Sequence, residues 1–282
     1  MKKINRVGIV IKPHAPRIES ILTELSAYLE KRGIECLLES AAAEKLRRPG
    51  GIRREEIPGR SDLVIVLGGD GTLLSIAHIA ACKNVPVMGV NLGSLGFLTE
   101  VPLGEMTITL DALLAGRTDI IGSRLLLESK FKGEVNLCLN DIVINKGALA
   151  RIIHVTIWID EKEIATVKAD GLIIATPTGS TAYSLSAGGP VIQPCIPAVL
   201  LTPICPHTLT FRPMVISSAA TIKLQLLTSG EEVYLTFDGQ RGSRLEKNDF
   251  VEVRRSGCEL KLVSSPKRNY FDLLPEKLSW AE

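Results

Sequence analysis

The chain has 282 residues, of which 45% are hydrophobic and only 4% aromatic, and its 33 basic and 31 acidic side chains nearly cancel. A formal net charge of +2 gives no electrostatic reason to expect a nucleic-acid partner or a membrane surface, so we expect neither. The length allows one large core or two moderate ones, built from aliphatic rather than aromatic side chains.

The cysteines and histidines argue against a metal centre held by the protein. No two of the six cysteines form a C-x-x-C pair, and the cysteines and histidines do not follow the four-ligand spacing of a zinc site; the cysteines are Cys36, Cys82, Cys138, Cys195, Cys205 and Cys258. Scattered cysteines in apolar surroundings are usually small core residues and suit a reducing compartment. We therefore expect a cytoplasmic protein without disulfides.

The first 120 residues alternate between strand and helix patterns. Apolar runs predict strands, and apolar residues at helical spacing predict helices between them. The charged interval 41–60, with its prolines and glycines, predicts an exposed loop. The expected strands are 6–12, 34–38, 63–67 and 85–90, and the expected helices are 18–29, a helix starting near Leu73, and 106–116. Such alternation indicates a parallel sheet with helices packed on it.

After about residue 120 the apolar period becomes two, which indicates a β-rich region. Alternation is clearest at 153–159, 222–226, 233–237 and 251–253. Residues 172–211 carry no charge, but their prolines and glycines exclude a membrane span, and we interpret them as buried interior beside a ligand. We thus predict an α/β domain over 1–120, an all-β domain over 121–265, and a C-terminal tail over 266–282 that packs back on the first domain.

The glycine-rich segment Gly68-Gly69-Asp70-Gly71-Thr72 follows a predicted strand and opens a helix. Its glycines permit close approach to a ligand, and its amides together with the helix N-terminus form a candidate phosphate cradle. It contains no lysine and is not a Walker A loop. A carboxylate in a phosphate site suits two roles, namely accepting a proton from an attacking hydroxyl or holding Mg²⁺. The alternative is a tight turn in which Asp70 or Thr72 caps the helix.

A second segment, from Asp170 to Pro190, packs short hydroxyls, small residues and glycines together after an apolar strand. Such a stretch offers many hydrogen-bond partners at close range and suits a planar polar ligand such as a nucleotide base, on which Tyr183 can stack. The alternative is a buried connecting loop of a β-sandwich. Ser180 and Ser184 lack the Gly-x-Ser-x-Gly elbow and a partner histidine, so a hydrolase is not indicated.

At these residues the sequence resembles the bacterial NAD kinase family. The resemblance rests on Gly68–Thr72, then Asn140-Asp141, then Asp170 to Pro190, with a weaker fourth block at Phe237-Asp238-Gly239-Gln240. The third block is specific to this family, whereas diacylglycerol-type lipid kinases share the first. The domain plan fits nearly the whole chain.

The resemblance implies a nucleotide-kinase-like N-terminal domain and an all-β C-terminal domain, with NAD bound between them. It implies that Asp70 accepts the proton, that Asn140 and Asp141 hold the adenosine, and that Thr181 to Ser186 form the adenine-binding stretch. Many members have Glu where this chain has Asp141, and the shorter side chain makes an indirect contact conceivable. The full set of implied ligand contacts is Gly68, Gly69, Gly71, Thr72, Asn140, Asp141, Arg151, Lys168, Asp170, Thr181, Ala182, Tyr183, Ser184, Leu185, Ser186 and Gln240.

The expected reaction is in-line transfer of a phosphoryl group from ATP–Mg²⁺ to the 2′-hydroxyl of the adenosine ribose of NAD, which forms NADP. The resemblance also implies a homodimer or homotetramer, in which a neighbouring subunit completes the site. A lipid kinase and a non-catalytic NAD(P)-binding regulatory protein are the alternatives. Polyphosphate in place of ATP, NADH in place of NAD, and feedback by NADPH stay open.

Overall fold

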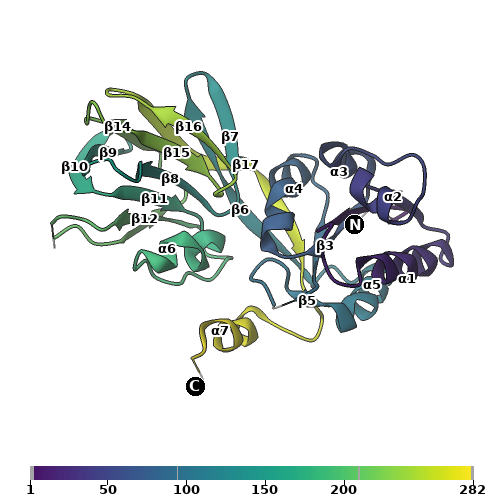
Figure 1. Cartoon of the computed structure of the whole chain (residues 1–282). Coiled ribbons are helices and arrows are strands. Elements are labelled where there is room, and N and C mark those ends of the chain that lie inside the picture. The colour runs from purple at the N-terminus through teal and green to yellow at the C-terminus, as the bar shows by residue number, and fades with distance from the viewer. Residues whose placement is uncertain (1–2, 94, 209, 281–282) are drawn as a thin grey trace. The chain divides into compact units, whose positions relative to one another are not determined.

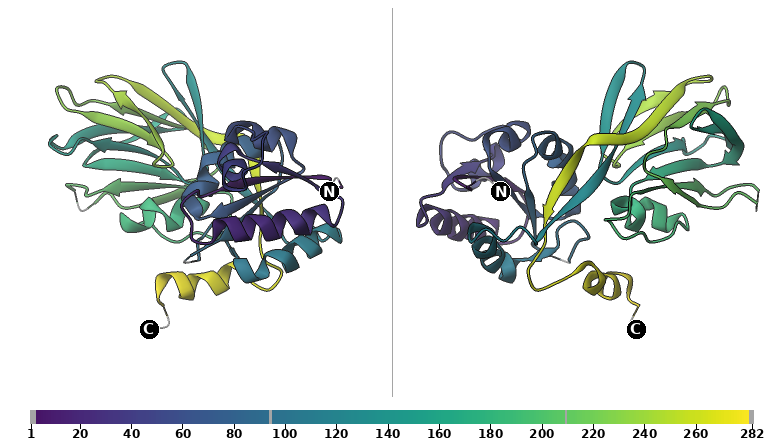
Figure 2. Two further views of the ribbon diagram at one scale, coloured as in Figure 1. Left: turned by 45° about the vertical axis from the view of Figure 1, so that its right-hand side comes forward. Right: turned by 180° about the vertical axis from the view of Figure 1, so that it is seen from behind.

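The computed structural model describes residues 3–93, 95–208 and 210–280. The chain divides into two compact units, the first made of Met1–Ser123 with Glu259–Glu282 and the second of Arg124–Cys258. The sequence-based division set its borders at residues 120 and 265. The borders of the units differ because two long strands, β6 (Ile121–Phe131) and β17 (Phe250–Val263), each contribute residues to both units. These two strands pair with each other, and they lie side by side in Figure 2.

The first unit is a parallel sheet with helices on both faces (Figure 1). Its strands run in the order β17-β4-β3-β1-β2, with the short β5 paired to β4. The strands are β1 (Arg6–Ile11), β2 (Glu35–Leu38), β3 (Leu63–Gly68), β4 (Val87–Asn91) and β5 (Val101–Pro102). The helices are α1 (Ile18–Glu30), α2 (Ser40–Lys45), η1 (Arg54–Glu56), α3 (Ile57–Arg60), α4 (Asp70–Cys82), η2 (Leu103–Glu105), α5 (Met106–Leu114) and α7 (Tyr270–Leu278). This arrangement confirms the predicted α/β class of the N-terminal part.

The two faces of this sheet are covered by different helices because side chains alternate along each strand. Ile9, Ile65 and Met88 share one fully buried cluster with Leu22 of α1 and Leu110 of α5. On the other face Gly8 leaves room for α3, since a Cβ there would lie 2.4 Å from Ile57 Cγ2. The sheet therefore lies between two layers of helices, with α1 and α5 on one face and α3 on the other.

The interval 41–60 is not the exposed loop that its composition predicts. It contains α2 and α3, and Ala42, Ala43 and Ile57 are buried. The prediction was wrong for these helices because Ala42 and Ala43 join the buried core and Ile57 packs against Gly8 of β1, whereas residues 47–51 between them are exposed as expected. The helix expected from Leu73 begins at Asp70, so the glycine loop itself forms its first turn.

The second unit is a β-sandwich, which confirms the all-β prediction for this part. One sheet is antiparallel in the order β13-β12-β11-β8-β15-β16, and the other contains β10-β9-β14-β17 with β6 and β7. The remaining elements are β7 (Glu134–Cys138), β8 (Asp141–Lys146), β9 (Ile153–Ile159), β10 (Lys162–Ala169), β11 (Gly171–Ala175), η3 (Thr178–Thr181), α6 (Tyr183–Ser186), β12 (Ala198–Ile204), β13 (Met214–Ser217), β14 (Ile222–Leu226), β15 (Val233–Phe237) and β16 (Arg241–Leu245).

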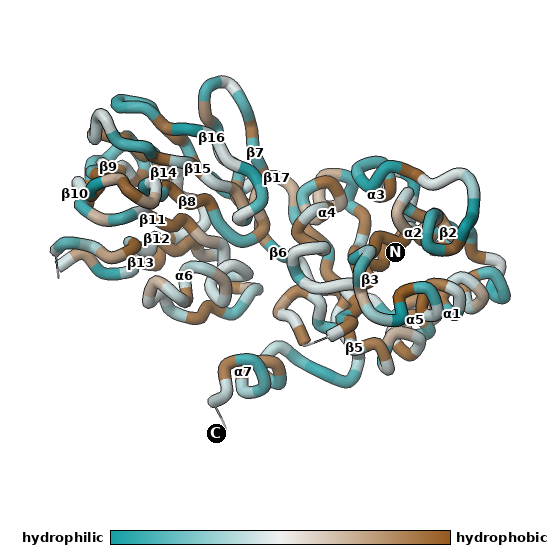
Figure 3. Tube along the Cα trace, in the orientation of Figure 1, coloured by the Kyte–Doolittle hydropathy of each residue, from teal (hydrophilic) through white to brown (hydrophobic). Residues whose placement is uncertain are grey.

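The sandwich core lies between these sheets. Ile144, Leu172 and Phe237 of one sheet share a buried cluster with Ile157 and Val253 of the other. The uncharged interval 172–211 supplies β11 and β12, which carry the hydrophobic colour in Figure 3. In the described part of the chain no helix has the length and apolar character needed to cross a membrane.

Candidate functional site

The glycine loop lies at the carboxyl edge of the parallel sheet of the first unit. β3 ends at Gly68, Gly69 is the N-cap residue of α4, and Asp70 is the first residue of that helix. Gly68 has to be glycine here, because a Cβ would lie 2.7 Å from Thr72 Oγ1 and 3.1 Å from Lys12 Cβ. The loop thus places Gly68, Gly69, Asp70, Gly71 and Thr72 together at the positive end of a 13-residue helix.

The carboxylate of Asp70 is held by a neighbouring loop of the same unit. Its Oδ2 accepts the backbone N–H of Phe97 at 3.0 Å. Its Oδ1 accepts the backbone N–H groups of Leu98 (3.1 Å) and Thr99 (2.9 Å) and the hydroxyl of Thr99 (2.9 Å). An acidic side chain that receives four hydrogen bonds is positioned rigidly, and its orientation does not depend on solvent.

Sequence reasoning missed this neighbouring loop. It follows β4 and contains Asn91 and Gly96; a Cβ on Gly96 would lie 2.0 Å from Asp70 Oδ1. Asn91 Nδ2 donates to Thr99 Oγ1 at 3.1 Å, and Asn91 Oδ1 accepts the N–H of Gly93 at 2.6 Å. The available signal was a second pair of glycines, Gly93 and Gly96, after a second buried parallel strand, since the carboxyl ends of such strands meet at one edge.

Asn140 and Asp141 lie in the second unit, where β8 begins beside the carboxyl end of β11. Asp141 pairs with Ala175, and the N–H of Thr176 donates to the carbonyl of Asn140 at 2.9 Å. Gly179 lies against Asn140 so closely that a Cβ would be 2.2 Å from the Asn140 carbonyl oxygen. The structure therefore brings Asn140, Asp141 and the start of the hydroxyl-rich segment together.

Asp238, which the sequence analysis named only within the weaker fourth block of the resemblance, holds this region in place. Its carboxylate accepts the backbone N–H groups of Leu139 (2.9 Å), Asn140 (2.7 Å) and Asp141 (3.1 Å). Burial raises the pKa of Asp238, and the three N–H donors act against that increase. Gln240 follows two residues later in the same turn and is exposed.

Asp141 is a buried acid with a strongly altered titration. Only 5% of the residue is exposed. Burial, and to a smaller extent the nearby charge of Asp238, raise the pKa of Asp141 to about 7. Because a buried carboxylate without compensating donors is costly, this group favours either protonation or a ligand that donates hydrogen bonds to it.

In the hydroxyl-rich segment, Asp170 to Pro190, some side-chain hydroxyls form hydrogen bonds within the second unit. Ser180 and Ser184 are fully buried; the hydroxyl of Ser180 donates to the Pro177 carbonyl at 2.6 Å, and that of Ser184 lies 2.8 Å from Thr202 Oγ1. Tyr183 is 42% exposed, while Thr181, Ala182 and Leu185 are half-buried and Ser186 is exposed. Thr178, which sequence reasoning did not single out, carries a buried hydroxyl with no hydrogen-bond partner among the described residues.

The three remaining predicted residues lie at the other end of β11. Asp170 precedes β11, and its carboxylate pairs with Lys146 at 3.1 Å. Lys168 is exposed on β10, and Arg151 is exposed in the loop before β9, where its N–H donates to Glu231 at 3.0 Å. At roughly 3.3 Å per strand residue, the length of β11 separates Asp170 from Asn140. One chain's second unit therefore does not bring these residues to Asn140.

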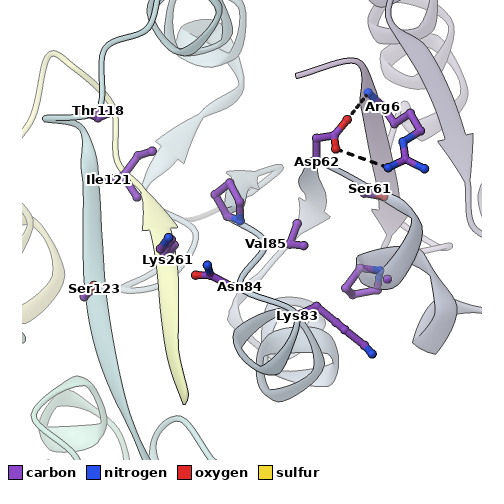
Figure 4. A pocket seen from close by; sticks show the side chains of 13 residues that line it. Arg6, Ser61, Asp62, Lys83, Asn84, Val85, Thr118, Ile121, Ser123 and Lys261 are labelled. Atoms are coloured by element: carbon purple, nitrogen blue, oxygen red, sulfur yellow. Dashed lines mark hydrogen bonds and ion pairs between the residues drawn. The ribbon is translucent and has the colours of Figure 1, made fainter. Parts of the chain in front are cut away.

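A cavity of about 570 Å³ opens at the opposite edge of the parallel sheet (Figure 4). Its lining includes Lys83, Asn84 and Lys261, together with Arg6, which pairs with Asp62. Arg6 begins β1, and Lys83 and Asn84 precede β4. Lys261 lies on β17 beside the start of β4, so the cavity is remote from the glycine loop at the carboxyl ends of these strands. None of the predicted site residues lines it.

No group of three or more His, Cys, Asp or Glu side chains able to hold a metal gathers within the part of the chain that the structure describes. All six cysteines are free thiols.

Comparison with known proteins agrees with this geometry. Residues 7–118 match the family model of the ATP-NAD kinase N-terminal domain, and residues 139–265 match that of the ATP-NAD kinase C-terminal domain. A curated NAD kinase of Geobacter sulfurreducens is 46% identical over 99% of this chain and 100% of its own length. A curated NAD kinase of Solibacter usitatus is 42% identical over the full length of both chains.

Solved structures show the same architecture. Yeast NADH kinase complexed with NADH superposes with a TM-score of 0.89 at 29% identity, over 99% of this chain and 89% of that one. An NAD kinase from Archaeoglobus fulgidus in complex with ATP, at 24% identity and a TM-score of 0.77 over 96% of this chain and 98% of its own, shares the fold. Fold and matches together define a two-domain nucleotide kinase. The chain belongs to the NAD kinase family.

Proposed function

We propose that this protein transfers the γ-phosphoryl group of ATP to the 2′-hydroxyl of the adenosine ribose of NAD, and so forms NADP. The observation that carries the proposal is the Asp70 carboxylate, which four hydrogen bonds hold at the carboxyl edge of the parallel sheet, beside a glycine loop. Phosphoryl transfer needs little covalent chemistry from the protein, so a fixed acceptor for the hydroxyl proton and a cradle for phosphates meet its main requirements.

In this proposal Asp70 orients the 2′-hydroxyl and accepts its proton as the oxygen attacks the γ-phosphorus. The glycine loop, which contains Gly68, Gly69, Gly71 and Thr72, lets the phosphates approach the backbone closely at the N-terminus of α4. A Mg²⁺ ion brought by ATP would supply neutralisation of the charge that builds up during transfer. The protein's own contribution is positioning.

The second unit supplies the adenosine contacts in this proposal. Asn140 and Asp141 are fixed by Asp238, and the buried Asp141 carboxylate accepts hydrogen bonds from the ligand. The unpartnered Thr178 hydroxyl and the exposed Tyr183 ring offer a hydrogen-bond partner and a stacking surface nearby in sequence. The same segment contributes further proposed ligand contacts from Thr181, Ala182, Leu185 and Ser186. Gln240 contributes one from the turn that contains Asp238.

Arg151, Lys168 and Asp170 lie a strand length away from Asn140. We propose that they serve NAD bound to a second copy of the chain, in a homodimer or homotetramer. Light scattering of the purified protein tests the assembly, and a monomer that turns over NAD at a normal rate would contradict it. We place the enzyme in the cytoplasm, where free thiols persist.

The decisive test is a coupled assay of the purified full chain with NAD, ATP and Mg²⁺, in which an NADP-specific dehydrogenase detects the product. NADP formation by the wild type and its loss in Asp70→Asn support both the reaction and the role of Asp70. The matched control is Asp119→Asn, an exposed carboxylate of the same unit that pairs only with Arg117 and should leave turnover unchanged.

Other outcomes of this assay favour the alternatives. Formation of NADP only when inorganic polyphosphate is supplied would show that polyphosphate, and not ATP, is the phosphoryl donor. Binding of NAD or NADP without turnover with either donor would indicate a regulatory binding protein. Phosphorylation of diacylglycerol in vesicles would indicate a lipid kinase.

A further inference from the structure

The hydrogen bonds around Asp70 are unevenly divided between its two oxygens. Oδ1 accepts three, from the N–H groups of Leu98 and Thr99 and from the Thr99 hydroxyl, whereas Oδ2 accepts one, from the N–H of Phe97. An ionised carboxylate offers about four lone-pair directions in total, about two on each oxygen. Among the described residues the donors therefore saturate Oδ1 and leave acceptor capacity only on Oδ2.

The donor and the acceptor of each hydrogen bond around Thr99 can be assigned by starting from a backbone N–H group. The N–H of Gly93 can only donate, so the atom of Asn91 that it meets at 2.6 Å must be the amide oxygen. The amide nitrogen of Asn91 then faces Thr99 Oγ1 at 3.1 Å and donates to it. Having accepted this bond, the Thr99 hydroxyl directs its single hydrogen to Asp70 Oδ1 at 2.9 Å.

Burial protects this chain of hydrogen bonds from water. Thr99 is 0% exposed and Asn91 is 7% exposed. Gly96 lies so close to Asp70 Oδ1 and Thr99 Oγ1 that a Cβ would be 2.0 Å and 2.3 Å from them. No water has room to replace the Thr99 hydroxyl on this side of the carboxylate.

We propose that Thr99, oriented by Asn91, is a positioning residue whose hydroxyl, together with two backbone N–H groups, holds Oδ1 of Asp70 and so directs Oδ2 to take the proton of the acceptor hydroxyl. The inference rests on the proposed function and assigns its proton transfer to one atom. The hydroxyl proton moves to Oδ2, the hydroxyl oxygen bonds to the γ-phosphorus, and the bond from that phosphorus to the β,γ-bridging oxygen breaks. ADP leaves with the electron pair, and Oδ2 later releases the proton to solvent.

The first test compares Thr99→Val with Thr99→Ser in the full-length enzyme. Valine keeps the shape and the backbone N–H but removes one of the three donors that hold Oδ1, so the carboxylate is fixed less firmly in its reactive orientation. We expect kcat to fall about 10–100-fold, the equivalent of one hydrogen bond to a charged group, while the KM for NAD changes about twofold or less. Serine retains the hydroxyl and should restore most of kcat.

The matched control is Thr109→Val in α5. Thr109 is also 0% exposed, lies in the same unit, and donates its hydroxyl to the Glu105 carbonyl at 2.8 Å. This variant should lose thermal stability as Thr99→Val does but keep the wild-type kcat. A parallel loss of kcat in both variants would show that lowered stability, not positioning, explains the effect.

A second test reverses the chain of hydrogen bonds without touching Thr99. In Asn91→Asp the new carboxylate can accept from Gly93 but cannot donate, so Thr99 turns its hydrogen towards residue 91 and away from Asp70. We expect a loss of kcat similar to that of Thr99→Val, and no further loss when both substitutions are combined. This variant carries the test if Thr99→Val fails to fold.

The outcomes separate the two proposals. A Thr99→Val enzyme with wild-type kcat, or additive losses in the double variant, overturns the positioning role while the kinase activity stands. Wild-type protein that makes no NADP with either donor overturns the proposed function and this inference with it. A serine variant as impaired as the valine variant also overturns the role of the hydroxyl.

Discussion

Oδ1 of Asp238 accepts the backbone N–H of Asn140 at 2.7 Å, although the two residues are 98 positions apart in the sequence. The same carboxylate also binds the N–H groups of Leu139 and Asp141, so three successive amides converge on one side chain. A charged acceptor that meets backbone donors fixes the course of the chain more firmly than a neutral one. The start of β8, where Asn140 and Asp141 lie, is thereby held in a single conformation.

Asp238→Asn should weaken both this conformation and NAD binding. The amide has one accepting oxygen, and its NH₂ group cannot accept the remaining N–H donors. We expect the KM for NAD to rise and the free energy of unfolding to fall by about 1–3 kcal/mol, as for buried donors left unsatisfied. Steady-state kinetics and urea unfolding measure the two effects.

The control for this substitution is Asp249→Asn. Asp249 accepts the N–H of Glu246 in a turn of the same unit, at 2.8 Å, remote from Asn140 in the sequence. Its replacement should leave the KM for NAD unchanged. If Asp238→Asn also leaves both the KM and the stability unchanged, the three hydrogen bonds do not hold the region in place.

The raised pKa of Asp141 predicts how the stability of the protein depends on pH. Burial raises its pKa in the folded protein to about 7, from an ordinary value of 3.8. Between these values the folded state holds a proton that the unfolded state has released, so this residue's contribution to stability falls as the pH rises from about 4 to about 7. Asp141→Asn removes the cost of ionising a buried carboxylate and should stabilise the ligand-free protein by roughly 1–4 kcal/mol at pH 8.

Urea unfolding of the wild type and of Asp141→Asn at about pH 4.5, 6 and 8 measures this difference. The advantage of the variant should grow with pH. Asp160→Asn, which changes an exposed turn carboxylate of the same unit, should show no such growth. A constant difference between Asp141→Asn and the wild type would contradict the raised pKa.

Gly96→Ala should displace the Asp70 carboxylate. The new Cβ would lie 2.0 Å from Asp70 Oδ1 and 2.3 Å from Thr99 Oγ1, so either the acid or the loop has to move. A misplacement of about 1 Å in a phosphoryl-transfer site costs on the order of 100-fold in rate, and we expect kcat to fall at least by that factor. The coupled NADP assay measures it.

Gly104→Ala is the matched control, because a Cβ at Gly104 meets no atom within 4 Å and the residue belongs to the same unit. Its kcat should equal that of the wild type. Normal turnover in Gly96→Ala would mean that the close packing of Gly96 against Asp70 is not needed for the reaction.

The ion pair between Glu39 and Arg54 should contribute to the stability of the first unit. The Glu39 side chain is 3% exposed; it accepts the N–H of Ile11 at 2.6 Å and Nε of Arg54 at 2.7 Å. Arg54→Met would leave a buried carboxylate without its counter-ion, which typically costs about 3–5 kcal/mol. Urea unfolding of the variant measures the loss.

The neighbouring Arg53 provides the comparison, since it forms an ion pair with Glu56 but its own side chain is 79% exposed. Arg53→Met should leave the free energy of unfolding nearly unchanged, because solvent screens an exposed ion pair. Equal effects of the two substitutions would show that burial does not decide the strength of these pairs.

Much of the fold and part of the candidate site were predictable. The change from helical to two-residue periodicity near residue 120 indicated an α/β part followed by a β-rich part, and Gly68–Thr72 was expected where a parallel strand ends. The role of Asp238 was not predictable, because the turn Asp238-Gly239 looks polar and exposed in sequence. The loop from Asn91 to Thr99 was missed for a related reason, since backbone N–H donors leave no signature in side-chain type.

The sequence by itself determined much of the strand and helix pattern and which residues are candidates for chemistry, because periodicity, glycine placement and residue type are local properties. Only the tertiary structure decided which distant groups meet. Asp70 receives its donors from Phe97, Leu98 and Thr99, and Asn140 is fixed by Asp238. These pairings depend on strand order and register, which bring carboxylates to backbone amides that nothing in the neighbouring sequence marks.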